Sequence, residues 1–257
     1  LLLLMLASVA VAPAYAATGA PLRVCIRPAL PGQDAAAMFA QADRFDCTRP
    51  QTDHGAGDYW ALSQPLADTT PPDARVRQAS LWQNRVTLYV RYADGAIRHV
   101  GFTSATTGRH LMLGAIVQLV LPPHHARPER LLWHIEGSLN RRGILVSPTI
   151  VDARTAARTE LEMAALYAAF AGMCLSLLIY NLALWGALRR EFQPAYCLMV
   201  LCLLAYAGCS SGLIGQITDI DNNDRQRLGY ALLGWSAAAA MVFARAFLER
   251  RVFDGWL

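Results

Sequence analysis

The chain has 257 residues, of which 54% are hydrophobic and 16% are charged, and its formal net charge is +4. The arginines recur singly or in pairs and form no dense basic run, so the charge does not favour a nucleic-acid partner. One average composition covers two environments, because the first half after the N-terminal segment is as polar as a soluble domain and the remainder is strongly apolar.

Residues 1–17, LLLLMLASVAVAPAYAA, form an apolar run that ends in the small-x-small pattern Ala14-Tyr15-Ala16. A run of about a dozen apolar residues is too short to span a membrane. We therefore predict a secretory signal peptide, cleaved after Ala16 or Ala17, with an uncleaved anchor as the alternative. Because an initiator Met and a basic leading segment are missing, we also expect the chain to lack its natural start.

Residues 18–155 are expected to form an all-β extracytoplasmic sandwich of the jelly-roll-like kind, serving as a sensor domain. Short runs of β-branched and aromatic residues are separated there by Pro, Gly and Asp. The run RVTLYVRY places Val86, Leu88, Val90 and Tyr92 on one face, which is the pattern of a half-buried strand. Residues 32–57 lack this pattern, so we expect a loop or one short helix there.

The predicted export bears on the oxidation state of the cysteines. Cys25 and Cys47 are the two cysteines between the leader and the first apolar span, and an oxidising compartment makes a disulfide between them plausible. Two unpaired, buried cysteines are the alternative. The other four cysteines lie within apolar spans, where we expect small packing residues: Cys174, Cys197, Cys202 and Cys209.

The β segment shows no catalytic motif: no G-x-S-x-G, no H-E-x-x-H and no Gly-rich phosphate loop occurs. We therefore predict that this stretch is not an enzyme and binds no cofactor. His124 and His125 are bracketed by prolines and have no third metal ligand nearby in the sequence, so we predict an exposed connection and no metal site.

A ligand site is expected on the solvent side of the strands. A polar ligand needs aromatic area together with hydrogen-bonding groups, and four residues on exposed strand faces offer these: Tyr89, Arg91, His134 and Glu136. The alternative is that they simply face water. Trp60 and Trp133 share strand faces with aliphatic residues, so we expect them in the core and not as stacking platforms for a sugar.

Residues 162–257 are expected to form a membrane domain. The run from Met163 to Leu188 contains no Asp, Glu, Lys, Arg or His, and its length suffices to cross a hydrocarbon core of about 30 Å. A buried helix of a soluble core is the alternative for this run. With two later apolar runs, the predicted spans are residues 163–188, 193–217 and 228–248. Residues 152–162 form a short polar approach to the first.

Two polar residues lie within these spans. We expect Asn181 to hydrogen-bond a neighbouring helix, and Arg245 to extend towards the membrane surface. The loop after the second span, D-I-D-N-N-D, begins like a calcium-binding loop. It has Asp224 where Gly is needed and Tyr230 where Glu is needed, so we do not predict calcium binding.

Charge sets the predicted orientation. Arg189-Arg190 and Arg250-Arg251 flank one side of the spans, and the acidic loop flanks the other. The positive-inside rule then places the basic ends in the cytoplasm and the β-domain outside. We therefore predict a multi-pass protein of the bacterial inner membrane, in contact with lipid, with a periplasmic N-terminal domain and a cytoplasmic C-terminus.

The order of these elements resembles the bacterial seven-transmembrane receptors with diverse intracellular signalling modules. The resembling segments are Asp58-Tyr59-Trp60, Gly172-Met173, Leu178-Ile179-Tyr180-Asn181-Leu182, Pro194-Ala195-Tyr196 and Phe243-Ala244-Arg245-Ala246-Phe247-Leu248. The resemblance implies a sensor related to carbohydrate-binding modules, seven helices and a cytoplasmic output domain such as a diguanylate cyclase or histidine kinase. It is also compatible with a homodimer.

The chain departs from that pattern because it has three predicted spans and no output domain. We expect a fragment of a longer receptor; a degenerate product that cannot transmit by itself is the alternative. The predicted function is a signal transducer that binds a small molecule or carbohydrate outside the cell. A membrane-anchored binding or scaffold protein without signalling is the competing interpretation.

Overall fold

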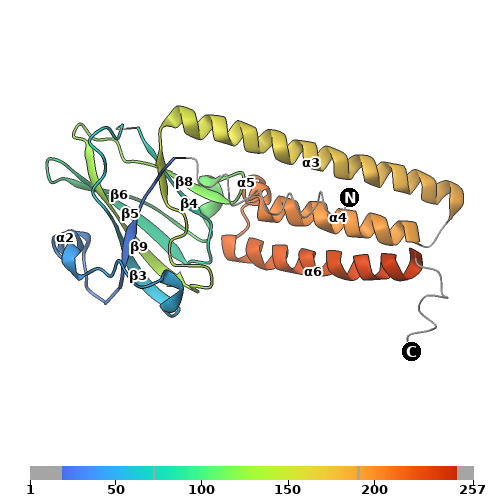
Figure 1. The fold of residues 1–257 in the computed structure, drawn as a ribbon, viewed down its shortest axis with the longest axis horizontal. Helices are drawn as coiled ribbons and strands as arrows, with labels where there is room; N and C mark the ends of the chain where they lie inside the picture. The colour runs from blue at the N-terminus through green and yellow to red at the C-terminus, as the bar shows by residue number, and fades with distance from the viewer. Residues whose placement is uncertain (1–18, 72, 190–191, 248–257) are drawn as a thin grey trace.

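A computed structural model of the chain describes residues 19–71, 73–189 and 192–247. The predicted signal peptide lies outside the described residues, as do Arg190, Arg250 and Arg251, on which the predicted orientation depends. The described chain consists of a β-sandwich and a group of long helices that extends away from it (Figure 1).

The sandwich consists of two antiparallel sheets of five strands each. Sheet A has the order β1 (Ala20–Pro21), β10 (Thr149–Val151), β4 (Arg75–Ala79), β8 (Ile116–Val120) and β7 (Leu111–Met112). Sheet B has the order β2 (Val24–Pro28), β3 (Gly57–Ser63), β9 (Pro128–Ser138), β5 (Arg85–Tyr92) and β6 (Ile97–Thr103). The predicted fold class, an all-β sandwich followed by apolar helices, is confirmed.

The main hydrophobic core lies between the two sheets. Strand β5 contributes Val86, Leu88 and Val90, all at 0% exposure, and β9 contributes Trp133. Alternate residues of a strand point to opposite faces, so the outward positions of β5 and β9 remain available for contacts outside this core. The inward face predicted for β5 is therefore confirmed.

A second, smaller core lies on the outer face of sheet B. Helix α2 (Ala35–Ala40) is capped by Asp34, whose carboxylate accepts from the Ala37 N–H at 2.7 Å. Its Met38 and Phe39 pack on Trp60, which is buried. Two 3₁₀ turns follow, η1 (Ala42–Arg44) and η2 (Gln51–Asp53).

A disulfide between Cys25 and Cys47 joins strand β2 to the segment that follows α2. Of the two states that the sequence leaves open for these cysteines, the structure has the bonded one.

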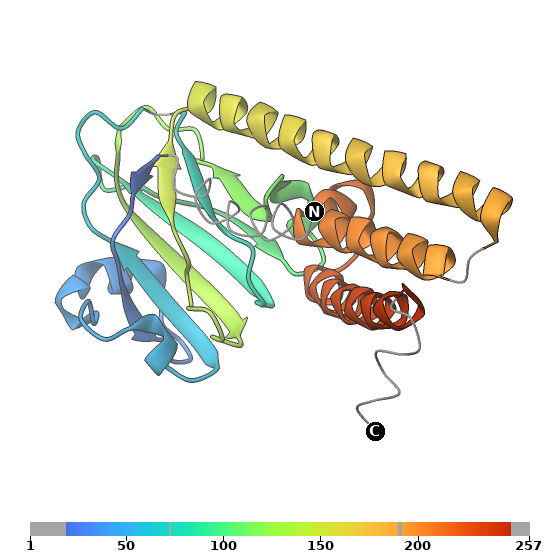
Figure 2. The ribbon, with the colours of Figure 1, turned by 45° about the vertical axis from the view of Figure 1, so that its right-hand side comes forward.

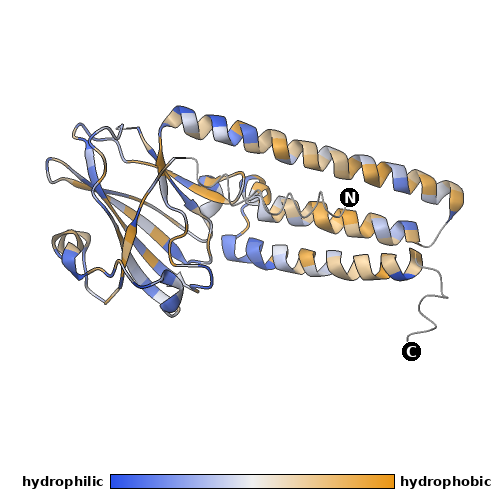
Figure 3. Cartoon of the chain, viewed as in Figure 1, coloured by the Kyte–Doolittle hydropathy of each residue, from blue (hydrophilic) through white to orange (hydrophobic). Residues whose placement is uncertain are grey.

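Up to residue 247, where the described part of the chain ends, four helices follow the sandwich: α3 (Ala153–Leu188), α4 (Phe192–Ser210), α5 (Leu213–Ile217) and α6 (Asn222–Phe247). Helices α3, α4 and α6 are long and apolar enough to cross a membrane, and α4 lies between the other two (Figures 1 and 2). Little of the apolar stretch of each helix is buried within the protein: 11% in α3, 28% in α4 and 11% in α6. The rest is apolar surface for lipid to cover, which Figure 3 shows as long hydrophobic stretches.

The polar approach to the membrane is the beginning of helix α3. Asp152 caps this helix by accepting from the Thr155 N–H at 2.9 Å. Ala156 lies within this polar stretch and Met163 directly follows it, yet both are buried. They are buried because this part of α3 runs beside the sandwich. At 1.5 Å per residue α3 is about 54 Å long, so one continuous helix connects the sandwich to the far side of the bundle.

The structure divides the second predicted span, residues 193–217. Gly212 has a φ of 86°, a left-handed conformation that ends α4 at Ser210. The following residues form α5, which turns against the sandwich. With 19 residues, α4 spans about 28 Å, close to the thickness of a hydrocarbon core.

Candidate functional site

Three of the four predicted ligand residues gather on the outer face of sheet B. Tyr89 lies on β5, and His134 and Glu136 lie on the paired strand β9. The imidazole of His134 stacks on Trp60, with ring centroids 4.2 Å apart, and its Nδ1 lies 3.6 Å from Glu136 Oε1. Tyr89 packs against the rings of Trp60 and His99.

Partial burial changes the acid–base behaviour of this face. Burial lowers the pKa of His134, an effect that the neighbouring carboxylate of Glu136 opposes. Burial also raises the pKa of Tyr89, and the charge of Glu136 raises it further. Both shifts favour the neutral forms of the imidazole and the phenol, which suits hydrogen bonding to a polar ligand.

Arg91, the fourth predicted residue, already has partners within the fold. It lies further along β5, where its Nε is 3.0 Å from Glu129 Oε2 and its guanidinium lies over the ring of Phe39. The structure thus brings Tyr89, His134 and Glu136 together and directs Arg91 towards the edge of the α2 core.

A shallow groove of about 470 Å³ runs beside this face along β5 and β6. Its lining residues include Arg85, Tyr89 and His99, together with Thr103 and Thr106 at the end of β6. Arg85 also lies 4.0 Å from Glu136. The groove and the predicted ligand residues therefore form one surface, which ends next to Ser104.

Ser104 is also where the sandwich meets the membrane helices. Residues 211–221, here called the connector, join α4 to α6 and lie against the sandwich. The Gly114 and Ala115 N–H groups both donate to the Ser211 carbonyl at 2.9 Å, and the Gln216 amide donates to the Leu111 carbonyl at 2.8 Å. These bonds fix both ends of α5 to the β7–β8 region.

The first residues of α6 make the most buried contacts of this interface. Asn222, only 3% exposed, donates through its amide to the Leu81 carbonyl and accepts from the Ser80 hydroxyl at 2.9 Å. Its backbone N–H donates to the Ser104 carbonyl, while the Ser104 hydroxyl donates to Asp221 at 2.6 Å. We call Ser80, Leu81, Ser104, Asn222 and Arg225 the junction.

Arg225 connects the junction to helix α4. Its guanidinium is buried, donates to the Ser80 hydroxyl at 3.1 Å and to the Asn222 side-chain oxygen at 2.9 Å, and also donates to the Cys209 carbonyl. A buried cation is costly unless its hydrogen bonds are made. Arg225 therefore holds α4, α6 and the sandwich in one arrangement.

A continuous series of backbone hydrogen bonds links the ligand face to the junction. The Asn84 N–H donates to the Glu136 carbonyl at 2.8 Å, and the Ser104 N–H donates to the Asn84 carbonyl at 2.8 Å. The Asn222 N–H then donates to the Ser104 carbonyl at 2.9 Å. Strands β9, β5 and β6 and helix α6 are thus joined at their adjacent ends.

A second pocket of about 470 Å³ opens beside the junction, between the sandwich and α6. It is lined in part by Trp82, Arg142 and Tyr230, and the Arg227 guanidinium lies over the Trp82 ring at 4.9 Å. Trp and Tyr side chains collect where a membrane meets water. Their position agrees with a membrane surface at the level of the junction.

Within the spans, the amide of Asn181 donates to the Leu177 carbonyl of its own helix at 2.9 Å. In the described part of the chain this contact differs from the expected bond to a neighbouring helix, because a side-chain amide can satisfy itself four residues back. Arg245 is exposed in the last described turn of α6.

The comparisons with known proteins bear on the helices described above. Residues 163–257 match a family described as 7TM diverse intracellular signalling. The helical part of the chain is similar to this family. The matched segment begins at Met163, where α3 leaves the sandwich. The 7TM diverse intracellular signalling domain is a membrane receptor and signalling domain, so this chain is a membrane protein. No curated protein matches the chain.

Asn222 and Arg225 were not predicted as functional residues. The only signal that marks them in the sequence is their place in a polar loop between two spans, and this signal does not show which surface the loop contacts. Asp221, which the calcium pattern includes, instead accepts a hydrogen bond from Ser104.

Proposed function

We propose that the chain is the sensing and membrane portion of a receptor. It binds a small polar molecule or carbohydrate on the outer face of sheet B and relays binding through the junction to the helix bundle. The bundle in turn controls a cytoplasmic output domain, such as a diguanylate cyclase or histidine kinase, outside this sequence. The family of the helical part supports the receptor class.

The chemistry of the groove supports the proposed ligand class. Tyr89 lines the groove with an aromatic surface and Arg85 with donors, and His134 and Glu136 offer further polar groups beside it on the paired strand β9. A flat aromatic surface beside hydrogen-bonding groups suits the apolar face and hydroxyls of a sugar ring.

The observation that carries the relay is the hydrogen-bond series from Glu136 through Asn84 and Ser104 to Asn222. A ligand in the groove contacts Thr103 and Thr106, on either side of Ser104. Suppose that the turn around Ser104 has two conformations and that the ligand binds one of them more tightly. Binding then shifts the population of junction arrangements and hence the packing of α4 and α6.

The arrangement of the helices supports the proposed orientation. The sandwich and the connector lie at one end of the spans, and the basic Arg189 lies at the other end of α3. With the basic end in the cytoplasm, the sandwich is periplasmic and the protein lies in the bacterial inner membrane.

The experiment uses the full chain in lipid nanodiscs. A panel of neutral sugars and sugar acids is screened by thermal shift, and a compound that stabilises the wild type is studied by hydrogen–deuterium exchange. We expect Tyr89→Ala to abolish the shift. In the wild type, we expect protection at β5 and β9 together with altered exchange in the connector.

Two adjacent asparagines provide a matched pair for the relay. Asn222→Ala removes the contacts to Ser80 and Leu81, whereas the Asn223 side chain makes no hydrogen bond to a described residue. Asn222→Ala leaves the backbone bond to Ser104 but removes the side-chain bonds that hold α6 to the sandwich, so it should retain protection of the sandwich and weaken the connector response. Asn223→Ala should retain both. Protection of the wild-type sandwich without any connector response would indicate a membrane-anchored binding protein without signalling.

A further inference from the structure

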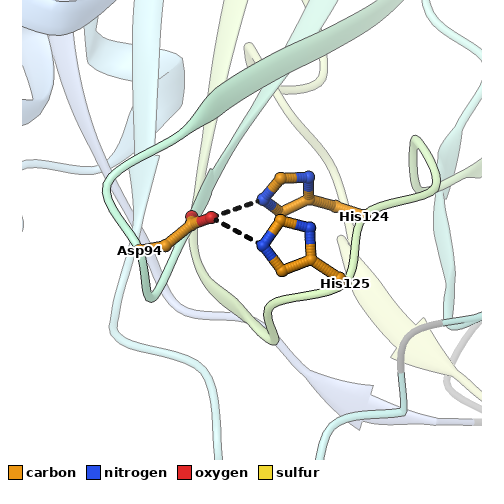
Figure 4. A group of neighbouring side chains, drawn as sticks. All are labelled: Asp94, His124 and His125. Atoms are coloured by element: carbon orange, nitrogen blue, oxygen red, sulfur yellow. Dashed lines mark hydrogen bonds and ion pairs between the residues drawn. The ribbon is translucent and has the colours of Figure 1, made fainter.

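Three side chains with metal-binding groups converge at the end of the sandwich away from the helices. Asp94 lies in the turn between β5 and β6, and His124 and His125 lie between β8 and β9. The Nε2 atoms of the two imidazoles lie 2.8 and 3.3 Å from the same oxygen, Asp94 Oδ2 (Figure 4). All three ligand atoms lie within 4.8 Å of one another.

The third ligand is not apparent from the local sequence, because Asp94 is 30 residues away from His124. The fold supplies it by placing the β5–β6 turn against the connection that carries the histidines. The fold thus gives the exposed histidine pair a third ligand, since both imidazoles point at one oxygen of the Asp94 carboxylate.

The backbone around the three residues is fixed by contacts that do not need a metal. The Tyr92 hydroxyl donates to the Pro122 carbonyl on one side of the histidines, and the Ala93 N–H donates to the Arg127 carbonyl on the other. The Tyr92 ring also packs on the His124 ring, with centroids 4.4 Å apart. Such preorganisation lowers the ordering cost of binding.

The two separations between histidine and aspartate are close to those around a tetrahedral ion. Ligand atoms about 2.0–2.1 Å from zinc lie about 3.3 Å from one another in a tetrahedron. The His125–Asp94 separation of 3.3 Å already has this value, and the His124–Asp94 separation of 2.8 Å needs to open by about half an ångström. Two imidazole nitrogens with one carboxylate oxygen favour zinc over magnesium or calcium, which prefer oxygen ligands.

We propose that Asp94, His124 and His125 form a zinc-binding site. The side chain of His124 is 9% exposed and that of His125 is 83% exposed, so the ion has a rigid inner ligand and an open path from solvent. Three protein ligands leave the fourth position for water or for an oxygen of a bound ligand.

A zinc ion here would join two parts of the sandwich. The β5–β6 turn belongs to sheet B, and the histidines lie on the chain that passes from β8 of sheet A to β9 of sheet B. Binding to the folded state alone stabilises that state. Zinc should therefore raise the unfolding temperature, and this effect does not depend on the proposed receptor function.

The experiment uses the full chain in detergent, purified without a histidine tag and stripped of metal by a chelator. Zinc uptake is measured by titration calorimetry, and cobalt(II) is substituted to obtain a visible spectrum that reports tetrahedral coordination. We expect one zinc per chain at this site, a raised unfolding temperature, and no response to magnesium.

Three variants test the assignment. Asp94→Asn and His125→Gln should each weaken zinc binding by more than about tenfold and abolish the cobalt spectrum. The exposed Asp43→Asn, which removes a carboxylate outside this cluster, is the matched control and should retain both. His125→Gln keeps the test decisive, since so exposed a side chain contributes little to folding. Absence of zinc uptake by the wild type, or equal uptake by wild type and His125→Gln, would overturn the proposal.

Discussion

At the scale of single residues, the partly buried imidazole of His134 makes stability depend on pH. Burial holds the pKa of His134 below its ordinary value of 6.5, so the unfolded chain takes up a proton at a higher pH than the folded chain does. Stability therefore falls as pH decreases below about 6.5 and stops falling below the folded-state pKa. His110 acts in the same direction, because burial and Arg109 lower its pKa.

We expect the unfolding temperature of the full chain to decrease between about pH 7.5 and 5. His134→Asn should reduce this decrease, and a double variant that also carries His110→Asn should reduce it further. The readout is the difference between the two pH values within each variant, because loss of stacking on Trp60 lowers stability at both. An unchanged pH dependence in the double variant would assign it to other groups.

The Cys25–Cys47 disulfide supports a second residue-scale prediction. It closes a loop of sequence separation 22, so it restricts the unfolded chain and stabilises the sandwich by about 3 kcal/mol. Replacing both cysteines by Ser should lower the free energy of unfolding by about this amount. The readout is denaturant unfolding of the sandwich. A reducing agent should affect only the wild type, and an equal effect on the variant would contradict the assignment.

At the scale of elements, the sequence predicts strands that show alternation and misses those that do not. Strand β5 was predicted because Val86, Leu88 and Val90 alternate with polar residues. Strand β4, RVRQA, shows no such alternation: Arg77 and Gln78 are neighbours that point to opposite faces of sheet A, yet each is 2% exposed. Arg77 is buried, and its charge interacts with that of Glu160 of α3, an interaction between distant segments that no local pattern encodes.

The candidate site was predicted in part for the same reason. Tyr89, His134 and Glu136 could be selected because strand period assigns each to an outward face. The junction and the Asp94–His124–His125 cluster depend on which loops meet, and loops from distant parts of the chain meet only once both sheets have formed. The break at Gly212 was also missed, because an apolar run continues through it.

Docking of α5 against η3 (Thr107–His110) supports an element-scale prediction. A Cβ atom at Gly108 would lie 2.2 Å from the Gly215 carbonyl oxygen, which is not a possible contact. Gly108→Ala should therefore displace the connector and increase hydrogen–deuterium exchange across residues 213–222. Gly55→Ala is the matched control, since a Cβ there meets nothing within 4 Å. Equal exchange in the two variants would show that α5 does not depend on this contact.

At the scale of the whole molecule, the sandwich is attached to the membrane helices in two places. Helix α3 continues from β10 along sheet A, and the connector binds the β7–β8 region and the junction. A domain held at one point could rotate about its linker, whereas two separated attachments restrict rotation. A change inside the sandwich can therefore reach α3, α4 and α6 as a change of helix packing.

The same arrangement predicts the topology of the protein in a cell. Three spans that start from a periplasmic sandwich must end in the cytoplasm. An exposed Thr69→Cys in the sandwich should react with a membrane-impermeant maleimide in intact bacterial cells, whereas the described free cysteines are buried in the helices and should not.

Green fluorescent protein fused after Leu257 should fluoresce, and alkaline phosphatase fused there should be inactive. Labelling of Thr69→Cys only after cell lysis, with an active phosphatase fusion, would reverse the orientation and place the ligand face in the cytoplasm. Labelling in intact cells together with an active phosphatase would instead mean that one of α3, α4 and α6 does not cross the membrane.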